Sequence, residues 1–288
     1  MESIDESGKK RPALRVLWNF HHACNYRCEY CVRKDDDLAR CPVPVEQLAA
    51  VWRRMHERYG TCWIDFTGGE PSTFPGFEHL VLELARDHAV HLITNLSLPL
   101  ETWERLVRGT AKNRFVISAS FHPTQAELEP FLEKCDLLHR HERLRFVNFV
   151  AWPPLLEKLG FFRKRFLERG LPFYALAFMG QHGGKQYPDA YTPEERSLIN
   201  DSGRTLVEIE ARRKAYQLGE VSPKGKLCRA GSQYIHVDQG KITRCSRLQG
   251  ESLGDLYSGE FDLLKEAAPC PADYCQCEFE WLKEFESY

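Results

Sequence analysis

The chain alternates short apolar runs with longer segments in which apolar residues recur every three or four positions. Short runs of this kind are typical of buried strands, and the longer period is typical of helices with one apolar face. The pattern predicts six strands, at residues 13–20, 62–67, 90–95, 115–121, 144–151 and 172–179. It predicts helices between them, at residues 44–59, 77–88, 100–108, 125–141 and 155–169.

Strands that alternate with helices favour a parallel sheet, because each helix carries the chain back to the start of the next strand. Six such units predict an α/β fold in which the sheet forms a partial, TIM-like (β/α)6 barrel. In barrels of this kind the functional residues lie at the C-terminal ends of the strands. The residues that follow each predicted strand are therefore the first candidates for a site.

Three cysteines follow the first predicted strand. Cys24, Cys28 and Cys31 have the spacing C-x3-C-x2-C. Thiolates bind iron–sulfur clusters and zinc. A structural zinc site needs four protein ligands and usually takes them as two pairs, whereas the next cysteine here is Cys41. The spacing favours a four-iron cluster with one open iron over three structural or zinc-binding thiols.

The segment Thr67-Gly68-Gly69-Glu70-Pro71 follows the second predicted strand. Adjacent glycines let the backbone approach a ligand closely, and the glutamate offers a carboxylate to an ammonium or hydroxyl group. Together with the three cysteines, this segment resembles the radical S-adenosylmethionine (SAM) superfamily. The resemblance covers roughly residues 14–180.

The resemblance implies that Cys24, Cys28 and Cys31 hold a [4Fe–4S] cluster whose open iron is chelated by SAM. It further implies that Gly68, Gly69 and Glu70 hold the methionine amino group and that Tyr30 lies near the adenine. The implied reaction begins with reductive cleavage of SAM to a 5′-deoxyadenosyl radical, which takes a hydrogen atom from a substrate carbon. The implied electron donor is a flavodoxin or a ferredoxin.

Polar residues stand at the ends of the third and fourth predicted strands. In related enzymes such residues reach the ribose and carboxylate of SAM, and here the positions are Thr94, Asn95, Ser118 and Ser120. The alternative for each is a strand-terminal group that caps the next helix. His122 follows directly and is a candidate substrate ligand or proton acceptor, unless it is structural.

Five cysteines gather in the last part of the chain. Cys228 and Cys245 flank residues 233–243, whose alternation and central Asp-Gln-Gly predict a β-hairpin that brings the two thiols together. Cys270, Cys275 and Cys277 follow. This arrangement resembles the SPASM/twitch-type auxiliary-cluster module of radical SAM enzymes, in its short twitch form with one auxiliary [4Fe–4S] cluster. Which two of the last three cysteines complete the site stays open, and a four-thiolate structural zinc site is the alternative.

These features divide the chain into four parts. A disordered arm at residues 1–13 precedes the radical SAM-like (β/α)6 core at 14–180. A bridging segment at 181–226, in which residues 181–185 are predicted to form a loop, leads to the auxiliary iron–sulfur module at 227–288.

Composition narrows the classes of function. The 288 residues are 43% apolar and 28% charged with a net charge of −2, which predicts no nucleic-acid partner. A basic cluster at 163–165 has helical spacing and predicts a solvated face. The chain has no apolar run of about 18 residues and no signal-peptide core, so no membrane association is predicted. Eleven cysteines then favour metal or redox chemistry over disulfides, in the cytoplasm.

The predicted function is a radical SAM oxidoreductase that performs a net oxidation with the auxiliary cluster as electron acceptor. The expected substrate is a small molecule such as a sugar or aminocyclitol, or a short peptide, because the first strand begins too early for a leader-binding domain to precede it. Alternatives are a redox-neutral radical SAM epimerase and a peptide-modifying (RiPP) maturase. A non-enzymatic zinc-binding module is a more distant alternative, and periodicity does not identify the side chains that select a substrate.

Overall fold

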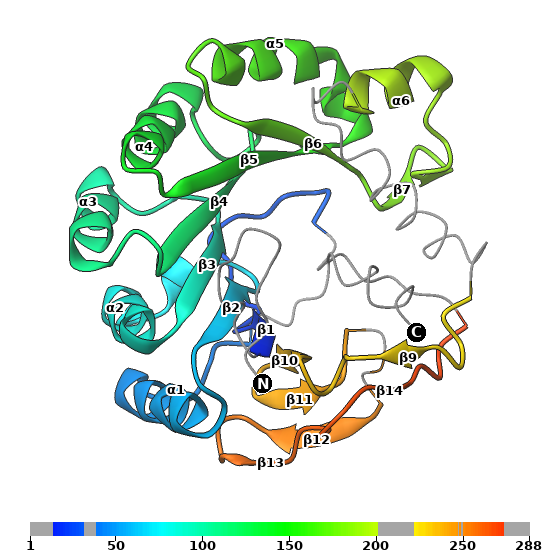
Figure 1. The fold of residues 1–288 in the computed structure, drawn as a ribbon. Coiled ribbons are helices and arrows are strands. Elements are labelled where there is room, and N and C mark those ends of the chain that lie inside the picture. Colours follow the sequence, from blue (N-terminus) through cyan, green and yellow to red (C-terminus); the bar gives the residue numbers. More distant parts are fainter. Residues whose placement is uncertain (1–13, 32–38, 201–221, 247, 249, 274–288) are drawn as a thin grey trace. The chain divides into compact units, whose positions relative to one another are not determined.

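The computed structural model describes residues 14–31, 39–200, 222–246, 248 and 250–273 (Figure 1). The chain divides into two compact units. The terminal unit consists of Met1–Phe20, Glu46–Asp65 and Arg204–Tyr288, and the central unit consists of His21–Val45 and Phe66–Gly203. The boundary between them falls within one strand, β2, and each unit is described by itself.

The central unit is built on four parallel strands in the order β3-β4-β5-β6. The strands are β3 (Ala89–Thr94), β4 (Phe115–Phe121), β5 (Leu144–Ala151) and β6 (Phe173–Ala177). The helices are α2 (Phe77–Asp87), α3 (Leu100–Gly109), α4 (Leu128–Arg140), α5 (Leu156–Leu167) and α6 (Pro193–Asn200), with short 3-10 turns at η1 (Pro71–Thr73) and η2 (Pro153–Leu155). Helices α2 to α5 lie along one face of the four strands (Figure 1).

Aromatic residues fill the layer between strands and helices in the central unit. Phe121 of β4 contacts Phe131 of α4 and Phe162 and Phe166 of α5, with ring centroids 4.9, 5.2 and 5.5 Å apart. Side chains alternate across a strand, so residues of the same parity as Phe121 face the helices. The other parity of β4, which includes Ser118 and Ser120, faces away from the helices.

The terminal unit joins the two ends of the sequence in one sheet. Strand β1 (Leu14–Asn19) runs parallel to β10 (Tyr234–Asp238), with Val16 opposite Ile235. Antiparallel strands β11 (Lys241–Thr243), β12 (Ser252–Asp255) and β13 (Glu260–Phe261) continue from β10, and β9 (Leu227–Cys228) pairs with β14 (Ala268–Pro269). Strand β2 (Cys62–Thr67) begins in this unit, and α1 (Val45–Tyr59) packs its Trp52 against Trp18 of β1 at 5.0 Å.

The fold is α/β, with parallel strands that resemble the predicted partial barrel and extra C-terminal strands that fit a small module. The six predicted strands are present, those at 62–67, 115–121 and 144–151 with the predicted bounds. None of the helices that the structure describes is long and apolar enough to cross a membrane.

Three details of the prediction were wrong. Helix α4 begins at Leu128, because the amides of Gln125 and Ala126 bond the His122 carbonyl in a turn that follows Pro123. The predicted loop at 181–185 is a hairpin, β7 (Gly180–His182) and β8 (Lys185–Tyr187), whose three-residue strands are too short to show a period. The basic cluster at 163–165 is only partly a solvated face, because Arg163 is buried and donates Nη2 to the Leu198 carbonyl at 2.6 Å.

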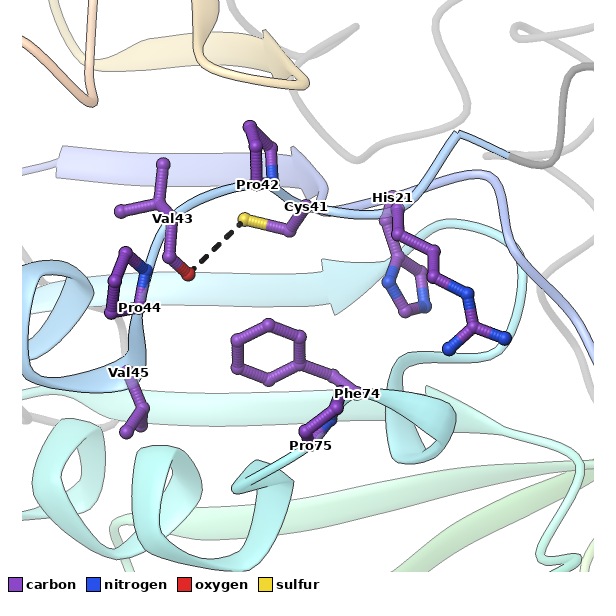
Figure 2. Close-up of a pocket in the computed structure, with 9 residues that line it drawn as sticks. His21, Cys41, Pro42, Val43, Pro44, Val45, Phe74 and Pro75 are labelled. Atoms are coloured by element: carbon purple, nitrogen blue, oxygen red, sulfur yellow. Dashed lines mark hydrogen bonds between the residues drawn. The ribbon is translucent and has the colours of Figure 1, made fainter.

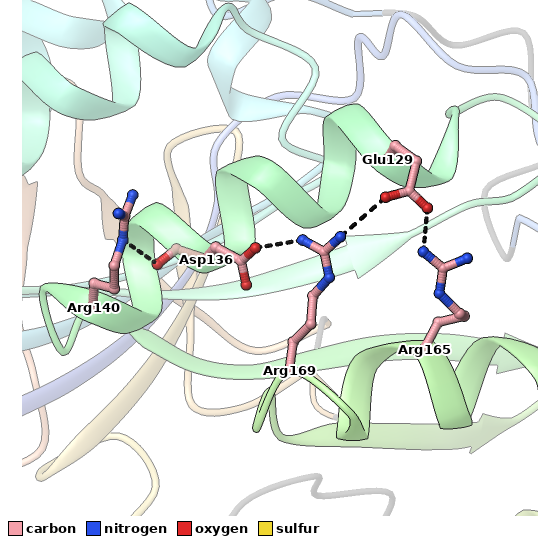
Figure 3. A network of polar contacts seen from close by, with 5 residues as sticks. All are labelled: Glu129, Asp136, Arg140, Arg165 and Arg169. Carbon is pink, nitrogen blue, oxygen red and sulfur yellow. Dashed lines mark hydrogen bonds and ion pairs between the residues drawn. The ribbon is translucent and has the colours of Figure 1, made fainter.

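An ion-pair network joins α4 to the end of α5 (Figure 3). The Arg169 guanidinium bonds Asp136 at 2.5 Å and Glu129 at 3.0 Å, and Arg165 also pairs with Glu129. Arg140 donates to the Asp136 carbonyl at 3.3 Å. These side chains are about a third to half exposed, so each pair contributes roughly 0–1 kcal/mol. The network supports helix packing and leaves no unpaired cluster of one charge there.

Candidate functional site

In the central unit, the loop that carries Cys24, Cys28 and Cys31 is joined to the Gly-Gly-Glu segment by backbone hydrogen bonds. The Gly69 amide donates to the His21 carbonyl at 2.7 Å, and the Glu70 amide donates to the Ala23 carbonyl at 2.8 Å. On the other side of the loop, the amide of Ala23 donates to the Ala39 carbonyl at 3.2 Å. The start of the cysteine loop is therefore held between the Gly-Gly-Glu segment and the chain that returns from the loop.

The glycines of this segment serve that backbone contact. A Cβ at Gly69 would lie 2.2 Å from the Ala23 carbonyl oxygen and 2.4 Å from the His22 carbonyl oxygen. Gly68 has a φ of 145°, which a residue with a side chain rarely adopts. The sequence predicted that the backbone of the paired glycines approaches another group closely. In the structure, Gly69 makes this close approach to the backbone of the cysteine loop.

Glu70 is buried and its carboxylate is bonded within the protein. Oε1 accepts from the Ser72 amide at 3.0 Å and from Thr94 Oγ1 at 2.7 Å, and Oε2 accepts from the Asn95 amide at 2.7 Å. Burial raises the pKa of the Glu70 carboxyl, and these hydrogen bonds oppose the shift. The carboxylate is therefore held by groups of the protein itself.

Asn95 connects the same centre to the cysteine loop. Its Nδ2 donates to Asn25 Oδ1 at 3.0 Å, and its Oδ1 accepts from the Ser97 amide at 3.0 Å. Thr94 and Asn95 thus lie at the predicted strand end, where both position Glu70. Their contact with a cofactor stays a prediction.

The two predicted serines occupy different depths of β4. Ser118 lies in the middle of the strand rather than at its end, and its Oγ is 2.7 Å from His91 Nε2 of β3. Ser120 is half-buried nearer the end of the strand. The sequence did not indicate that a neighbouring histidine engages Ser118.

Aromatic rings hold the far end of the cysteine loop. The Tyr30 hydroxyl is 3.1 Å from His122 Nδ1, and the two rings stack with centroids 5.8 Å apart. Trp152, which follows β5, contacts Tyr30 at 5.4 Å and His182 at 5.4 Å. Burial lowers the pKa of His122 to about 4, so its imidazole is neutral near pH 7. Tyr30, the residue before the third cysteine, is therefore held by His122, which follows β4, and by Trp152, which follows β5.

A pocket with a volume of about 280 Å³ lies beside the cysteine loop (Figure 2). Its walls are mainly apolar, and its lining consists of His21, Arg40, Cys41, Pro42, Val43, Pro44, Val45, Phe74 and Pro75. The Cys41 thiol donates to the Val43 carbonyl at 3.9 Å. His21 Nε2 donates to the Glu70 carbonyl at 2.9 Å, so one wall of the pocket is bonded to the Gly-Gly-Glu segment.

Comparison with known proteins identifies the central motifs. Residues 18–123 match the family model described as the Radical SAM superfamily. This segment is a radical SAM domain. A curated relative of the domain, the "Probable GTP 3′,8-cyclase" of Methanocella arvoryzae, is 30% identical over 95 residues, which are 33% of this chain and 30% of that protein. The match therefore spans less than a third of the relative's length.

Solved structures share the fold around the radical SAM domain. A histidine-tagged anSMEcpe with bound AdoMet has a TM-score of 0.58 at 17% identity, over 88% of this chain and 81% of that one. Native anSMEcpe with bound AdoMet and Cp18Cys peptide has a TM-score of 0.57 at 16% identity, over 84% and 77%. At this identity the likeness concerns the fold alone.

The radical SAM domain implies SAM and a SAM-binding [4Fe–4S] cluster as cofactors, and its thiols fit such a group. Burial, together with the charges of the neighbouring Cys31 and Cys24, raises the pKa of Cys28 to about 11. Neighbouring thiolates repel each other, and a soft, positively charged metal centre bound between them would relieve this repulsion. Among the residues that the structure describes, no three His, Cys, Asp or Glu side chains stand together in a way that could hold a single metal ion.

The second group of cysteines lies in the terminal unit, outside the radical SAM domain. Cys228 of β9 is opposite Ala268 of β14, two residues before Cys270. Cys245 packs in a small core against which Cys228 also packs. Burial, together with the charges of Cys270 and Cys245, raises the pKa of Cys228 to about 12. The structure thus places three predicted ligands near one another, in an arrangement that does not by itself hold a metal ion.

The remaining two predicted ligands, Cys275 and Cys277, lie outside the described residues. They carry the fourth thiol if the site is a four-cysteine site.

Sequence reasoning missed four residues that organise the radical SAM domain: His21, Asn25, His91 and Trp152. His21 and Asn25 lie within the motif segment, but nothing in its spacing distinguishes them from their neighbours. Trp152 did carry a signal, since it follows directly on a predicted strand end, where site residues gather.

Replacement of His122 by phenylalanine tests its contact with Tyr30. The variant keeps a ring for stacking and removes one hydrogen-bond partner of the Tyr30 hydroxyl, so we expect the free energy of unfolding to fall by about 1 kcal/mol. Urea unfolding of the full chain measures this. His122→Ala, which also removes the ring, should lose more. Equal stability of the phenylalanine variant and the parent would show that the contact between His122 and the Tyr30 hydroxyl does not contribute to the free energy of unfolding.

Proposed function

We propose that the chain is a radical SAM oxidoreductase with one auxiliary [4Fe–4S] cluster. The observation that supports the oxidative part is the proximity of Cys228, Cys245 and Cys270 in the terminal unit. Structural stability alone does not require three thiols at one place in a chain with this many apolar side chains. A second cluster offers an acceptor for the electron that remains after hydrogen-atom abstraction, which favours a net oxidation over a redox-neutral reaction.

The proposed roles follow from where the side chains lie. Cys24, Cys28 and Cys31 would hold the first cluster, and when bound that cluster would supply an electron for SAM cleavage to a 5′-deoxyadenosyl radical. Glu70 orients the Gly-Gly-Glu backbone through its bonds to Thr94 and Asn95. Tyr30, packed between the rings of His122 and Trp152, offers an aromatic surface to the adenine.

Two roles at the strand ends belong to the proposal as well. Ser120 is nearer the end of β4 than Ser118 and would be the serine of this strand that reaches SAM. His122 would act on Tyr30 rather than on a substrate proton, because its Nδ1 faces the tyrosine hydroxyl.

The substrate is proposed by class alone, as a small hydroxylated molecule or a short peptide. The cyclase match spans a third of this chain, and the peptide-bound structure shares only the fold. A flavodoxin or ferredoxin as donor and a cytoplasmic location complete the proposal, since the thiols require reducing conditions. The division into an arm at 1–13, a core at 14–180, a bridge at 181–226 and a cluster module at 227–288 is part of it.

Iron and sulfide content after anaerobic reconstitution tests the two-cluster proposal. The parent should hold about eight irons and eight sulfides per chain, the content of two four-iron clusters. Cys245→Ala should hold about four and should still cleave SAM, without coupled oxidation of substrate.

About four irons in the parent would leave the radical SAM chemistry and favour a redox-neutral reaction, such as an epimerisation. Zinc in place of iron at the C-terminal cysteines would have the same consequence. Full coupled oxidation by Cys245→Ala would contradict the acceptor role.

A further inference from the structure

Arg244 of the terminal unit is a buried cation that bonds three backbone carbonyls. Its Nε donates to Ala230 at 3.1 Å, and its Nη1 and Nη2 donate to Pro269 at 3.3 Å and Ala268 at 3.2 Å. The residue is 7% exposed. Five donors in a rigid planar fork allow a guanidinium to bond several carbonyls at once, which an ammonium group does less well.

The bonded carbonyls belong to the segments that carry the clustered cysteines. Ala230 lies two residues after Cys228, and Pro269 directly precedes Cys270. Arg244 itself directly precedes Cys245. One side chain therefore ties together the three segments that carry Cys228, Cys245 and Cys270.

The surroundings of Arg244 fix its stem, and an ion pair that it forms within the described part of the chain is a long one. A Cβ at Gly231 would lie 3.0 Å from Arg244 Cγ, so the glycine makes room for the stem. The ion pair with Glu251 is long, at 3.9 Å, and the Glu251 side chain is 53% exposed.

We propose that Arg244 is a positioning residue of the auxiliary centre, which holds the three cysteine-bearing segments together and raises the reduction potential of the cluster bound there. The inference rests on the proposed auxiliary cluster. A four-iron cluster with four thiolates becomes more negative when it takes up an electron. A buried cation beside it stabilises the reduced form more than the oxidised form.

The test uses the full chain with Cys24, Cys28 and Cys31 replaced by alanine, so that only the auxiliary cluster remains. Iron content and the midpoint potential, measured by EPR during a dithionite titration, are compared for this parent, Arg244→Lys and Arg244→Gln. Both substitutions should lower the iron content, because neither side chain bonds three carbonyls. Arg244→Gln should also shift the potential to a more negative value, whereas Arg244→Lys should shift it less.

Arg143→Lys is the matched control. Arg143 is also buried and donates to four backbone carbonyls, of Val107, Thr110, Ala111 and Phe115, in the central unit. The Arg143→Lys substitution should lower the free energy of unfolding and leave the potential of the auxiliary cluster unchanged.

The outcomes separate this inference from the function on which it rests. A parent without iron would remove the auxiliary cluster, and the inference with it. Four irons in the parent, together with unchanged iron content and potential in both Arg244 variants, would overturn the inference alone. Loss of the cluster from both variants would support the positioning role. Glu251→Gln, which removes the opposing charge, should then shift the potential upward, and a downward shift would overturn the charge effect.

Discussion

Replacement of Cys28 by alanine is expected to abolish SAM cleavage. The sulfur lies between two further thiols of one loop, and a three-thiolate cluster site cannot lose a ligand without losing the cluster or its open iron. At metal sites even outer-shell changes cost 10- to 100-fold, so we expect a loss of more than about 100-fold. Deoxyadenosine formation with dithionite, normalised to protein, measures the rate, and iron content should fall by about four per chain, as for one four-iron cluster.

Cys135→Ala is the control for this substitution. Cys135 is fully buried on α4, and burial raises its pKa well above the usual value, so it is a neutral thiol in an apolar layer. Its removal should cost some stability and leave iron content and SAM cleavage unchanged. Equal activity of the Cys28 and Cys135 variants would contradict the assignment of the cysteine loop.

Replacement of Gly69 by alanine is expected to separate the two motifs of the radical SAM domain. The added Cβ would meet the carbonyl oxygens of Ala23 and His22 at 2.2 and 2.4 Å, and backbone atoms cannot rotate away as a side chain can. Overpacking of this kind costs roughly 3 kcal/mol or more when the neighbours are held. The free energy of unfolding and the iron content of the cluster should both fall, as measured by urea unfolding and iron analysis.

Gly160→Ala is the control for Gly69→Ala. It makes the same chemical change, but we expect the opposite effect on the free energy of unfolding. A Cβ at this position of α5 meets nothing within 4 Å, and alanine favours helix more than glycine does. The free energy of unfolding should rise by about 0.5–1 kcal/mol, with iron content unchanged. If Gly69→Ala behaved like Gly160→Ala, the close packing of the two motif loops would be disproved.

The strands of the fold could be predicted where they are long enough to show a pattern. The runs at 62–67, 115–121 and 144–151 have six to eight residues, and their bounds agree with β2, β4 and β5. Strands of two to four residues, such as β7 and β13, carry too few positions to reveal alternation. The pairing of β1 with β10 was not predicted either, because hydrophobic periodicity does not indicate which strand will be a neighbour.

The site was predictable where its chemistry is concentrated in one short segment. The spacing of Cys24, Cys28 and Cys31 is local, whereas the partners of Glu70 are not. The Asn95 amide that bonds Glu70 is 25 residues away, and the Asn25–Asn95 contact spans 70 residues. Such contacts arise from the fold. The sequence therefore indicated which polar residues stand at the strand ends, but it did not indicate which of these residues form hydrogen bonds with each other.

The parallel pairing of β1 with β10 has a consequence for synthesis on the ribosome. Arg15 is opposite Tyr234, so the partner of the first strand emerges about 220 residues after it. At roughly 5–20 residues per second, β1 waits on the order of 10–40 s with one edge open. An open edge is a template for pairing with other chains. Nascent chains that stop before Tyr234 should therefore depend on chaperones more than longer ones do.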